Sequence, residues 1–95
     1  MCKGNNYILT IGIPVYNGGA FIADTIKSIR IPQEFEGKVE ILVSDNCSID
    51  DTARIVKRFP HVFYYKNQLN IGYDRNVNNV FLKARGKFVW PIAAD

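Results

Sequence analysis

The sequence predicts an α/β protein with a Rossmann-like, three-layer α/β/α architecture and a mainly parallel sheet. Apolar, β-branched runs alternate along the 95 residues with segments whose apolar residues recur at helical spacing, in the order strand, helix, strand, helix, strand, helix, strand. Helices between successive strands imply right-handed crossovers and parallel pairing. The length allows one small domain, which we expect to span residues 1–95.

The first strand and the first helix are expected within residues 7–30. Residues 7–15 (YILTIGIPV) have the composition of a strand buried on both faces, and Pro14 is expected to end it because proline cannot donate to a ladder. Asn17-Gly18-Gly19 is a turn signal. The helix expected over residues 20–30 has three isoleucines on one face: Ile22, Ile26 and Ile29.

The second strand and the second helix follow in residues 39–60. Residues 39–44 (VEILVS) predict a short buried strand. Ser48 with Asp51 three residues later matches a capping box, so a helix is expected to start at Ser48. Pro60 is expected to end that helix.

A third helix is expected between the last two strands. Residues 62–66 predict a strand, and residues 67–72 predict a polar loop. The apolar residues of the helix fall on one face: Val77, Val80, Phe81 and Ala84. Gly86 lies where a glycine commonly ends a helix, and residues 87–94 form the fourth apolar run.

Composition and charge exclude several classes of protein. A hydrophobic content of 47% is too high for a disordered chain, and no apolar run reaches the roughly 18 residues of a membrane helix. The net charge of +3 comes from scattered basic residues, so no nucleic-acid partner is expected. Two cysteines and one histidine are too few for a disulfide framework or a zinc site.

Polar residues follow the ends of the predicted strands, where open parallel sheets bind their ligands. They are Tyr16-Asn17, Asp45-Asn46, residues 67–70 and Asp95. Neither a P-loop nor a G-x-G-x-x-G turn is present, so two common phosphate-binding solutions are excluded. The pattern predicts the place of a site without naming its ligand.

Asp45 and Arg75 each have a functional and a structural interpretation. The Asp45 carboxylate can accept hydrogen bonds from a ribose hydroxyl or a base N–H, or only from backbone amides of its own turn. Arg75 can pair with phosphate or stack on a base, or it can be a solvated surface side chain. The residue types alone leave these alternatives open.

Four segments resemble the signatures of the family 2 glycosyltransferases, which have the GT-A fold. TIGIPVYNGGAFIADTIKSI resembles the opening strand, the P-x-Y-N turn and the first helix, and ILVSDNCSIDDT resembles the D-D/N-x-S-x-D-x-T signature. NQLNIGYDRN resembles the N-x-G-x-x-x-x-R-N pattern, and GKFVWPIAAD resembles the strand that leads into the D-x-D motif. The resemblance covers nearly the whole chain and implies the N-terminal, nucleotide-sugar-binding half of a GT-A domain, truncated after the fourth strand.

The resemblance implies a role for each matching position. Six residues would bind the nucleotide part of a sugar donor: Pro14, Tyr16, Asn17, Asp45, Asn46 and Arg75. Asp95 matches the last acid of D-x-D and would bind a divalent cation, Mg²⁺ or Mn²⁺, which neutralises the diphosphate leaving group. Ala93 occupies the first D-x-D position, so one carboxylate of the pattern is absent.

The implied activity is transfer of a sugar from a nucleotide-diphosphate sugar, expected to be a UDP-sugar, to a saccharide or lipid-linked acceptor in polysaccharide or glycoconjugate biosynthesis. The catalytic base is expected beyond residue 95, so the isolated chain is expected to be inactive. The alternative is a non-catalytic or degenerate nucleotide-binding or interaction module that lacks the acceptor half. The resemblance also implies a cytoplasmic protein, peripheral at the inner face of a membrane. The exposed edge of the last strand is expected to support a homo-oligomer.

Overall fold

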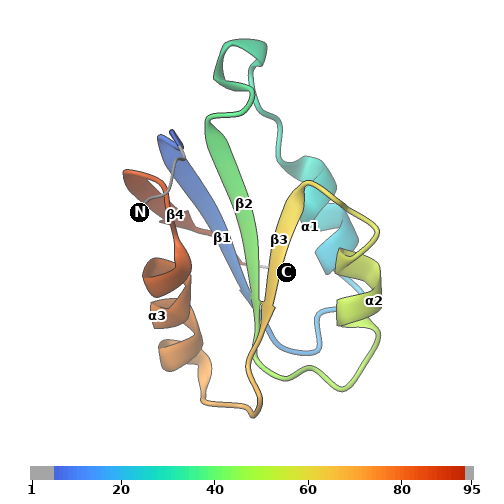
Figure 1. Ribbon diagram of the computed structural model, residues 1–95. Helices are drawn as coiled ribbons and strands as arrows, with labels where there is room; N and C mark the ends of the chain where they lie inside the picture. The colour runs from blue at the N-terminus through green and yellow to red at the C-terminus, as the bar shows by residue number, and fades with distance from the viewer. Residues whose placement is uncertain (1–5, 94–95) are drawn as a thin grey trace.

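The computed structural model describes residues 6–93, which form one four-stranded sheet with helices on both faces (Figure 1). The strands are β1 (Leu9–Val15), β2 (Val39–Asp45), β3 (Val62–Lys66) and β4 (Phe88–Pro91). The helices are α1 (Ile22–Ser28), the 3₁₀ turn η1 (Gln33–Phe35), α2 (Thr52–Val56) and α3 (Tyr73–Lys83). All neighbouring strands pair in parallel, so the predicted α/β class with a parallel sheet is confirmed.

The two faces of the sheet differ in how they pack. On one face α1 and α2 cover a cluster of aliphatic side chains: Ile13, Val15, Ile22, Ile26, Ile41, Val43, Val56 and Val62. On the other face α3 lies against β1 and β2, opposite α1 and α2 (Figure 1). Gly12 faces α3, and a Cβ at this position would lie 2.1 Å from Cγ1 of Val80. Only glycine therefore allows α3 to approach β1 this closely.

The order of the strands in the sheet changes direction at β1. The chain adds β2 and β3 on one side of β1, and after α3 it returns to add β4 on the other side, giving the order β3-β2-β1-β4. The ladders pair Val15 with Asp45 and Gly12 with Pro91, so the carboxyl ends of three strands share one edge of the sheet. Ligands of open α/β sheets bind at such a switch point.

Pro14 does not end the first strand, which corrects the sequence-based expectation. It lies inside β1 and pairs with Ser44 of β2. The Gly12 carbonyl accepts a hydrogen bond from Ile92 N–H on the β4 side, and alternate residues of a strand direct their backbone groups to the same side. The nitrogen of Pro14 therefore faces the β4 side beyond the end of the β4 ladder, where no donor is required.

Two other sequence-based expectations are wrong. Ser48 does not begin a helix: α2 begins at Thr52, and the Ser48 side chain bonds to Asp45 instead. Gly86 is not a left-handed helix terminator, because its φ angle is not positive. A Cβ on Gly86 would lie 2.6 Å from the Thr10 nitrogen, so its small size allows the chain to pass close to β1.

An ion pair between Glu40 and the partly exposed Arg85 connects the amino end of the sheet to the segment that leads into β4. The Glu40 side chain is fully buried and accepts hydrogen bonds from Thr10 and from the Arg85 backbone and guanidinium. The Arg85 guanidinium also lies over the rings of Tyr7 and Phe63, at 5.2 and 4.5 Å from their centroids.

Within residues 6–93, no helix is long and apolar enough to cross a bilayer.

Candidate functional site

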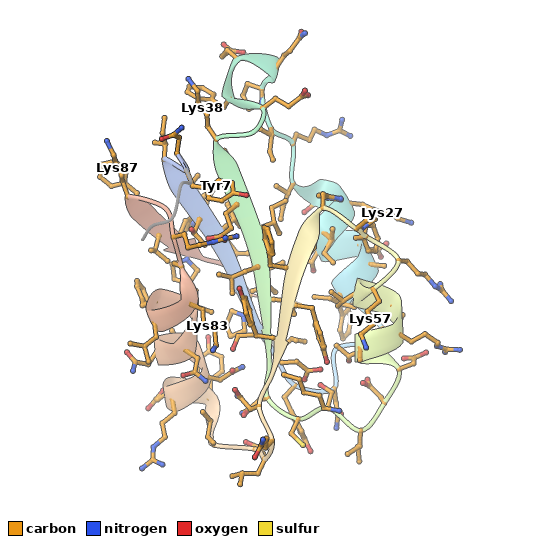
Figure 2. The ribbon with its side chains drawn as sticks, in the orientation of Figure 1. Tyr7, Lys27, Lys38, Lys57, Lys83 and Lys87 are labelled. Atoms are coloured by element: carbon orange, nitrogen blue, oxygen red, sulfur yellow. The ribbon has the colours of Figure 1, made fainter. Side chains whose placement is uncertain are left out.

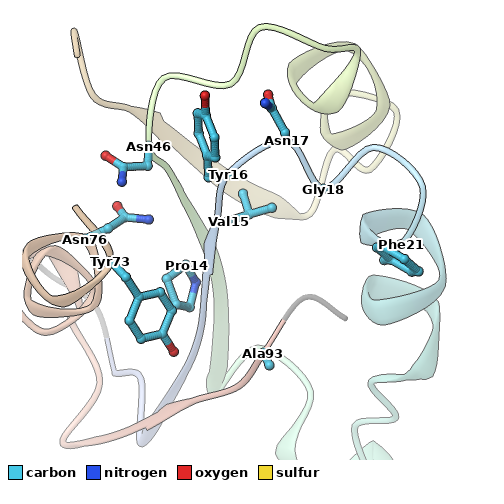
Figure 3. A pocket seen from close by; sticks show the side chains of 10 residues that line it. All are labelled: Pro14, Val15, Tyr16, Asn17, Gly18, Phe21, Asn46, Tyr73, Asn76 and Ala93. Atoms are coloured by element: carbon cyan, nitrogen blue, oxygen red, sulfur yellow. The ribbon is translucent and has the colours of Figure 1, made fainter. Parts of the chain in front are cut away.

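A hollow of about 460 Å³ lies at the carboxyl edge of the sheet (Figure 3). The residues that line it come from the end of β1, the loop between β1 and α1, the residue after β2, α3 and the segment after β4: Pro14, Val15, Tyr16, Asn17, Gly18, Phe21, Asn46, Tyr73, Asn76 and Ala93. None of these lining residues is charged. The structure brings together four of the predicted site residues here: Pro14, Tyr16, Asn17 and Asn46.

Three aromatic side chains border the hollow with much of their surface open to solvent. The exposed fractions are 49% for Tyr16, 53% for Phe21 and 69% for Tyr73. Phe21 lies on the α1 side of the hollow and Tyr73 on the α3 side (Figure 3). Aromatic faces of this kind can stack on a planar ring, and the tyrosine hydroxyls can donate or accept hydrogen bonds.

The loop after β1 is held by the loop after β2. Asn17 has a left-handed backbone (φ 51°), a conformation that asparagine tolerates better than most residues. Its N–H donates to Ser48 Oγ (2.8 Å), and its Oδ1 accepts from Ile49 N–H (2.9 Å). Gly19 N–H donates to Asp50 Oδ2 (3.0 Å). These three bonds fix the backbone that forms one wall of the hollow.

Asp50 fastens this loop pair to the start of α2. Its Oδ1 accepts from both the N–H and the hydroxyl of Thr52, the first residue of α2. Partial burial alone would raise the pKa of Asp50, but the hydrogen bonds from Thr52 and Gly19 outweigh it and hold the pKa below its usual value. The carboxylate form of Asp50 is therefore favoured in the folded protein.

Asp45 is fully buried and does not line the hollow. Its Oδ1 accepts from the backbone N–H (2.9 Å) and the hydroxyl of Ser48, and its Oδ2 accepts from the Tyr64 hydroxyl. Burial, followed by the hydrogen bond and the charge of Asp45, raises the pKa of Tyr64. Asp45 thus accepts a backbone amide of its own turn, as one interpretation of the sequence expects, and its role toward a nucleotide stays a prediction.

A network of amide side chains connects the end of β2 to the start of α3. Asn46 donates to Asn70 Oδ1 (2.8 Å) and to the Gly72 carbonyl (3.2 Å), and its Oδ1 accepts from Asn67 Nδ2 (3.1 Å) and Ile71 N–H (2.9 Å). These contacts use both donors and both acceptor directions of the Asn46 amide. Asn46 is therefore a structural tie as well as a lining residue.

Asn76 extends this network to the neighbouring part of β2. Its Oδ1 accepts from Ser44 Oγ (2.7 Å) and Asn67 Nδ2 (3.1 Å), and its Nδ2 donates to the Ser44 carbonyl (2.9 Å). Tyr73 and Asn76 are three positions apart on α3 and so share the helix face toward the hollow (Figure 3). Neither residue was among the predicted site residues.

The structure does not bring Arg75 into the hollow. Successive residues of a helix are rotated by about 100°, so Arg75 points away from the direction of Asn76 and is exposed. With the described residues it makes no hydrogen bond or ion pair. Its role near the diphosphate stays a prediction.

The described residues do not by themselves supply a cation site. Within residues 6–93, no group of three or more histidine, cysteine, aspartate or glutamate residues could hold a metal ion. Asp45, which precedes the lining residue Asn46, has both carboxylate oxygens engaged in hydrogen bonds. Asp95, the predicted ligand, lies outside the described residues.

The fold belongs to the doubly wound α/β class, whose members bind ligands at the carboxyl ends of the strands, and the hollow lies at that edge. Within that class, the chain belongs to glycosyl transferase family 2, because the model of that family matches residues 10–95. This confirms the family that the sequence signatures indicate.

Curated relatives cover nearly the whole chain. The abequosyltransferase RfbV of Salmonella typhimurium is 30% identical over 94 residues, which is 93% of this chain and 28% of that protein. The GalNAc(5)-diNAcBac-PP-undecaprenol β-1,3-glucosyltransferase of Campylobacter jejuni is 35% identical over 86 residues, which is 85% of this chain and 27% of that protein. The chain thus spans less than a third of the length of these relatives.

Solved structures share the fold. The TarS structure from S. aureus in complex with UDP superposes with a TM-score of 0.78 at 23% identity, over 93% of this chain and 27% of that chain. The mannosyltransferase PcManGT from Pyrobaculum calidifontis, in complex with GDP-Man and Mn²⁺, superposes with a TM-score of 0.75 at 26% identity, over 92% of this chain and 27% of that chain. These likenesses confirm the predicted glycosyltransferase fold class.

Proposed function

We propose that the hollow binds the nucleotide of a nucleoside-diphosphate sugar, and that the chain is the donor-binding part of a glycosyltransferase. The observation that carries this proposal is the position of the hollow, between the carboxyl ends of β1, β2 and β4 at the switch point of the sheet. Family membership supports it and favours it over a non-catalytic interaction module. Relatives and neighbours named as transferases of abequose, glucose and mannose also support it.

The lining residues suggest how a nucleotide would bind. The Tyr16 ring, half-exposed beside Pro14, is proposed to stack on the base. The Oδ1 of Asn17 accepts from Ile49 N–H, whereas the Nδ2 of Asn17 makes no hydrogen bond with the described residues. This Nδ2 can therefore donate to a ribose or phosphate oxygen. Asp45 is proposed to orient the base, and Arg75 to approach the diphosphate.

The donor is proposed to be a UDP-sugar, and the acceptor a saccharide or a lipid-linked saccharide. A complex of TarS with UDP and the undecaprenol-linked substrate named for the Campylobacter relative support these two classes. In this proposal the present chain binds and orients the donor, and the base that deprotonates the acceptor comes from outside residues 1–95. A cytoplasmic protein at the inner face of a membrane is proposed on the same grounds.

A divalent cation is proposed to accompany the nucleotide, with Asp95 as its ligand. The match of Asp95 to the last acid of the D-x-D motif supports this, as does the Mn²⁺ in the PcManGT complex. The cation would supply positive charge to the diphosphate. The hollow itself has no charged lining residue that could do so.

A homo-oligomer through the outer edge of β4 is also proposed. Phe88 and Trp90 on this strand are 67% and 59% exposed, and Trp90 borders an apolar hollow of about 330 Å³ with Ile8, Ile31 and Phe35. Exposed apolar surface of this kind favours association. Light scattering of the wild-type chain and of Trp90→Ser tests it: a wild-type monomer at high concentration contradicts it.

The first experiment is an NMR titration of the ¹⁵N-labelled chain with UDP, with and without Mg²⁺. We expect shifts of the Tyr16, Asn17, Tyr73 and Asn76 signals, because these residues line the hollow. Tyr16→Ala should weaken the binding about tenfold through the lost stacking, and Asp95→Asn should remove only the Mg²⁺-dependent part. A dispersed spectrum that UDP leaves unchanged would contradict the proposed function.

A further inference from the structure

We propose that Tyr64 is a positioning residue for the nucleotide site: its hydroxyl, acting through Asp45 and Ser48, sets the backbone position of Asn17 at the wall of the hollow. This inference rests on the proposed function, since it concerns the same hollow. Tyr64 lies on β3 and does not itself line the hollow. No family signature noted in the sequence includes it.

The contacts form a continuous series from β3 to the hollow. The Tyr64 hydroxyl donates to Asp45 Oδ2, and the Ser48 hydroxyl donates to Asp45 Oδ1. The Ser48 oxygen then accepts the Asn17 N–H at 2.8 Å. Two donors of the series, the Tyr64 and Ser48 hydroxyls, meet at the carboxylate of Asp45, and hydrogen bonds to a carboxylate are charge-assisted and stronger than neutral ones.

The burial of the series makes each of its bonds consequential. Asp45 is 0% exposed and Ser48 is 5% exposed, so water has little access to replace a lost partner. A buried carboxylate that loses a donor is penalised more than an exposed one. Without the Tyr64 hydroxyl, Asp45 Oδ2 must find another donor, and only the bonds from the Ser48 N–H and hydroxyl to Oδ1 still restrain rotation of the carboxylate.

The Asn17 backbone is the part of the site most sensitive to such a rotation. Its left-handed conformation (φ 51°) is uncommon for residues other than glycine, although asparagine tolerates it better than most, and the hydrogen bonds around Asn17 stabilise it. Ser48 Oγ is the acceptor for its N–H. Tyr64 also has the chemistry to remain a donor, because burial and the neighbouring Asp45 raise its pKa and keep the hydroxyl protonated.

The next residue in the chain provides a matched control. Tyr64 and Tyr65 lie on opposite faces of β3: Lys57, which follows α2, covers the Tyr64 ring at 5.7 Å, and Lys83 of α3 covers the Tyr65 ring at 5.0 Å. Figure 2 shows Lys57 and Lys83 on the two sides of β3. With the described residues the Tyr65 hydroxyl makes no hydrogen bond, so Tyr65→Phe removes the same atom without touching the series.

The test compares UDP binding by the wild-type chain, Tyr64→Phe and Tyr65→Phe in the NMR titration, with Mg²⁺ present. We expect Tyr64→Phe to raise the Kd for UDP about three- to tenfold, and Tyr65→Phe to leave it unchanged. In the absence of UDP, Tyr64→Phe should also shift the Asn17 amide signal and speed its hydrogen exchange. Ser48→Ala, which removes the acceptor at the other end of the series, should reproduce both effects even where Tyr64→Phe folds poorly.

The outcomes separate this inference from the proposed function. Wild-type binding of UDP, together with unchanged affinity and an unchanged Asn17 amide in both Tyr64→Phe and Ser48→Ala, would overturn the positioning role alone. A loss of thermal stability in Tyr64→Phe without a change in Kd would likewise show a purely structural role. A wild-type chain that does not bind UDP would overturn the proposed function, and the positioning role with it.

Discussion

Gly12 of β1 lies directly beneath Val80 of α3, so close that a Cβ on the glycine would come within 2.1 Å of Cγ1 of the valine. Val80 is fully buried in this contact. The contact sets the height of α3 above the sheet, and α3 carries Tyr73 and Asn76 to the hollow. The packing of one glycine is thereby linked to the geometry of the site.

Gly12→Ala is therefore expected to displace α3 and to lower the free energy of unfolding by about 1–3 kcal/mol, as overpacking of a core does. It should also weaken UDP binding, because Tyr73 and Asn76 move with the helix. Chemical denaturation and the NMR titration measure the two effects. Adding Val80→Ala should recover part of the loss, and a double variant whose destabilisation equals the sum of the two single changes would contradict the proposed contact.

Arg85→Ala is expected to destabilise the protein strongly without affecting the nucleotide site. The change leaves the fully buried Glu40 carboxylate without its charged partner, which costs about 3 kcal/mol. Both residues lie near the amino end of the sheet, away from the hollow. Denaturation curves should show the loss, and Arg85→Ala combined with Glu40→Gln should be more stable than Arg85→Ala alone. A changed Kd for UDP in a folded Arg85→Ala protein would contradict this separation.

The stability of the fold is expected to fall in acid partly through Asp50. Its folded-state pKa lies below the unfolded value of 3.8, so the stability that it contributes is complete above that value. The contribution is lost as the pH falls through the lower, folded-state pKa. Measured between pH 2 and pH 6, the free energy of unfolding of Asp50→Asn should depend less steeply on pH than that of the wild type.

Asp24→Asn is the control for the charge change. It removes the same charge from the exposed first turn of α1, where the carboxylate makes no hydrogen bond with the described residues. An Asp50→Asn protein whose pH profile coincides with that of the wild type would show that the bonds from Thr52 and Gly19 do not favour the charged form.

Asn76→Asp is expected to disturb the network that holds the start of α3. The substitution replaces the Nδ2 that donates to the Ser44 carbonyl with an acceptor, so two oxygens face one another in a buried place. We expect a loss of about 1–3 kcal/mol in the free energy of unfolding and weaker UDP binding. Asn78→Asp, exposed two residues further along the same helix, is the matched control and should change neither. Equal effects of the two variants would show that only the added charge matters.

The sequence predicts where the strands and helices lie more accurately than the residues at which the strands end and the helices begin. The strand expected at residues 62–66 coincides with β3, because four consecutive apolar or aromatic residues between Pro60 and Asn67 leave little alternative. The expectation that Pro14 ends its strand is wrong because the general rule against proline assumes a neighbouring strand on both sides. That neighbour is absent at this point of the β4 ladder, and only the strand order reveals it.

The site could be predicted in part. Pro14, Tyr16, Asn17 and Asn46 were expected and do line the hollow, since each follows or ends a strand whose position the hydrophobic pattern fixes. Tyr73 and Asn76 were not among the predicted site residues. The helical spacing of three between them was visible, but it gains meaning only when the face of α3 that meets the sheet is known. The sequence could not predict a role for Tyr64, because it does not show whether the hydroxyl of a tyrosine in a strand contacts a carboxylate.

Pro91 has a consequence for how another chain could meet this sheet. Phe88 and Ile92 direct their amides to β1, so the nitrogens of Val89 and Pro91 face the outer rim of β4, and the proline has no hydrogen to donate there. Carbonyl acceptors thus outnumber amide donors along that rim, which disfavours a continuous intermolecular β-ladder. Contact at β4 would then depend on the side chains of Phe88 and Trp90. Its calorimetric signature would be that of apolar burial: a small enthalpy near 25 °C and a negative change in heat capacity.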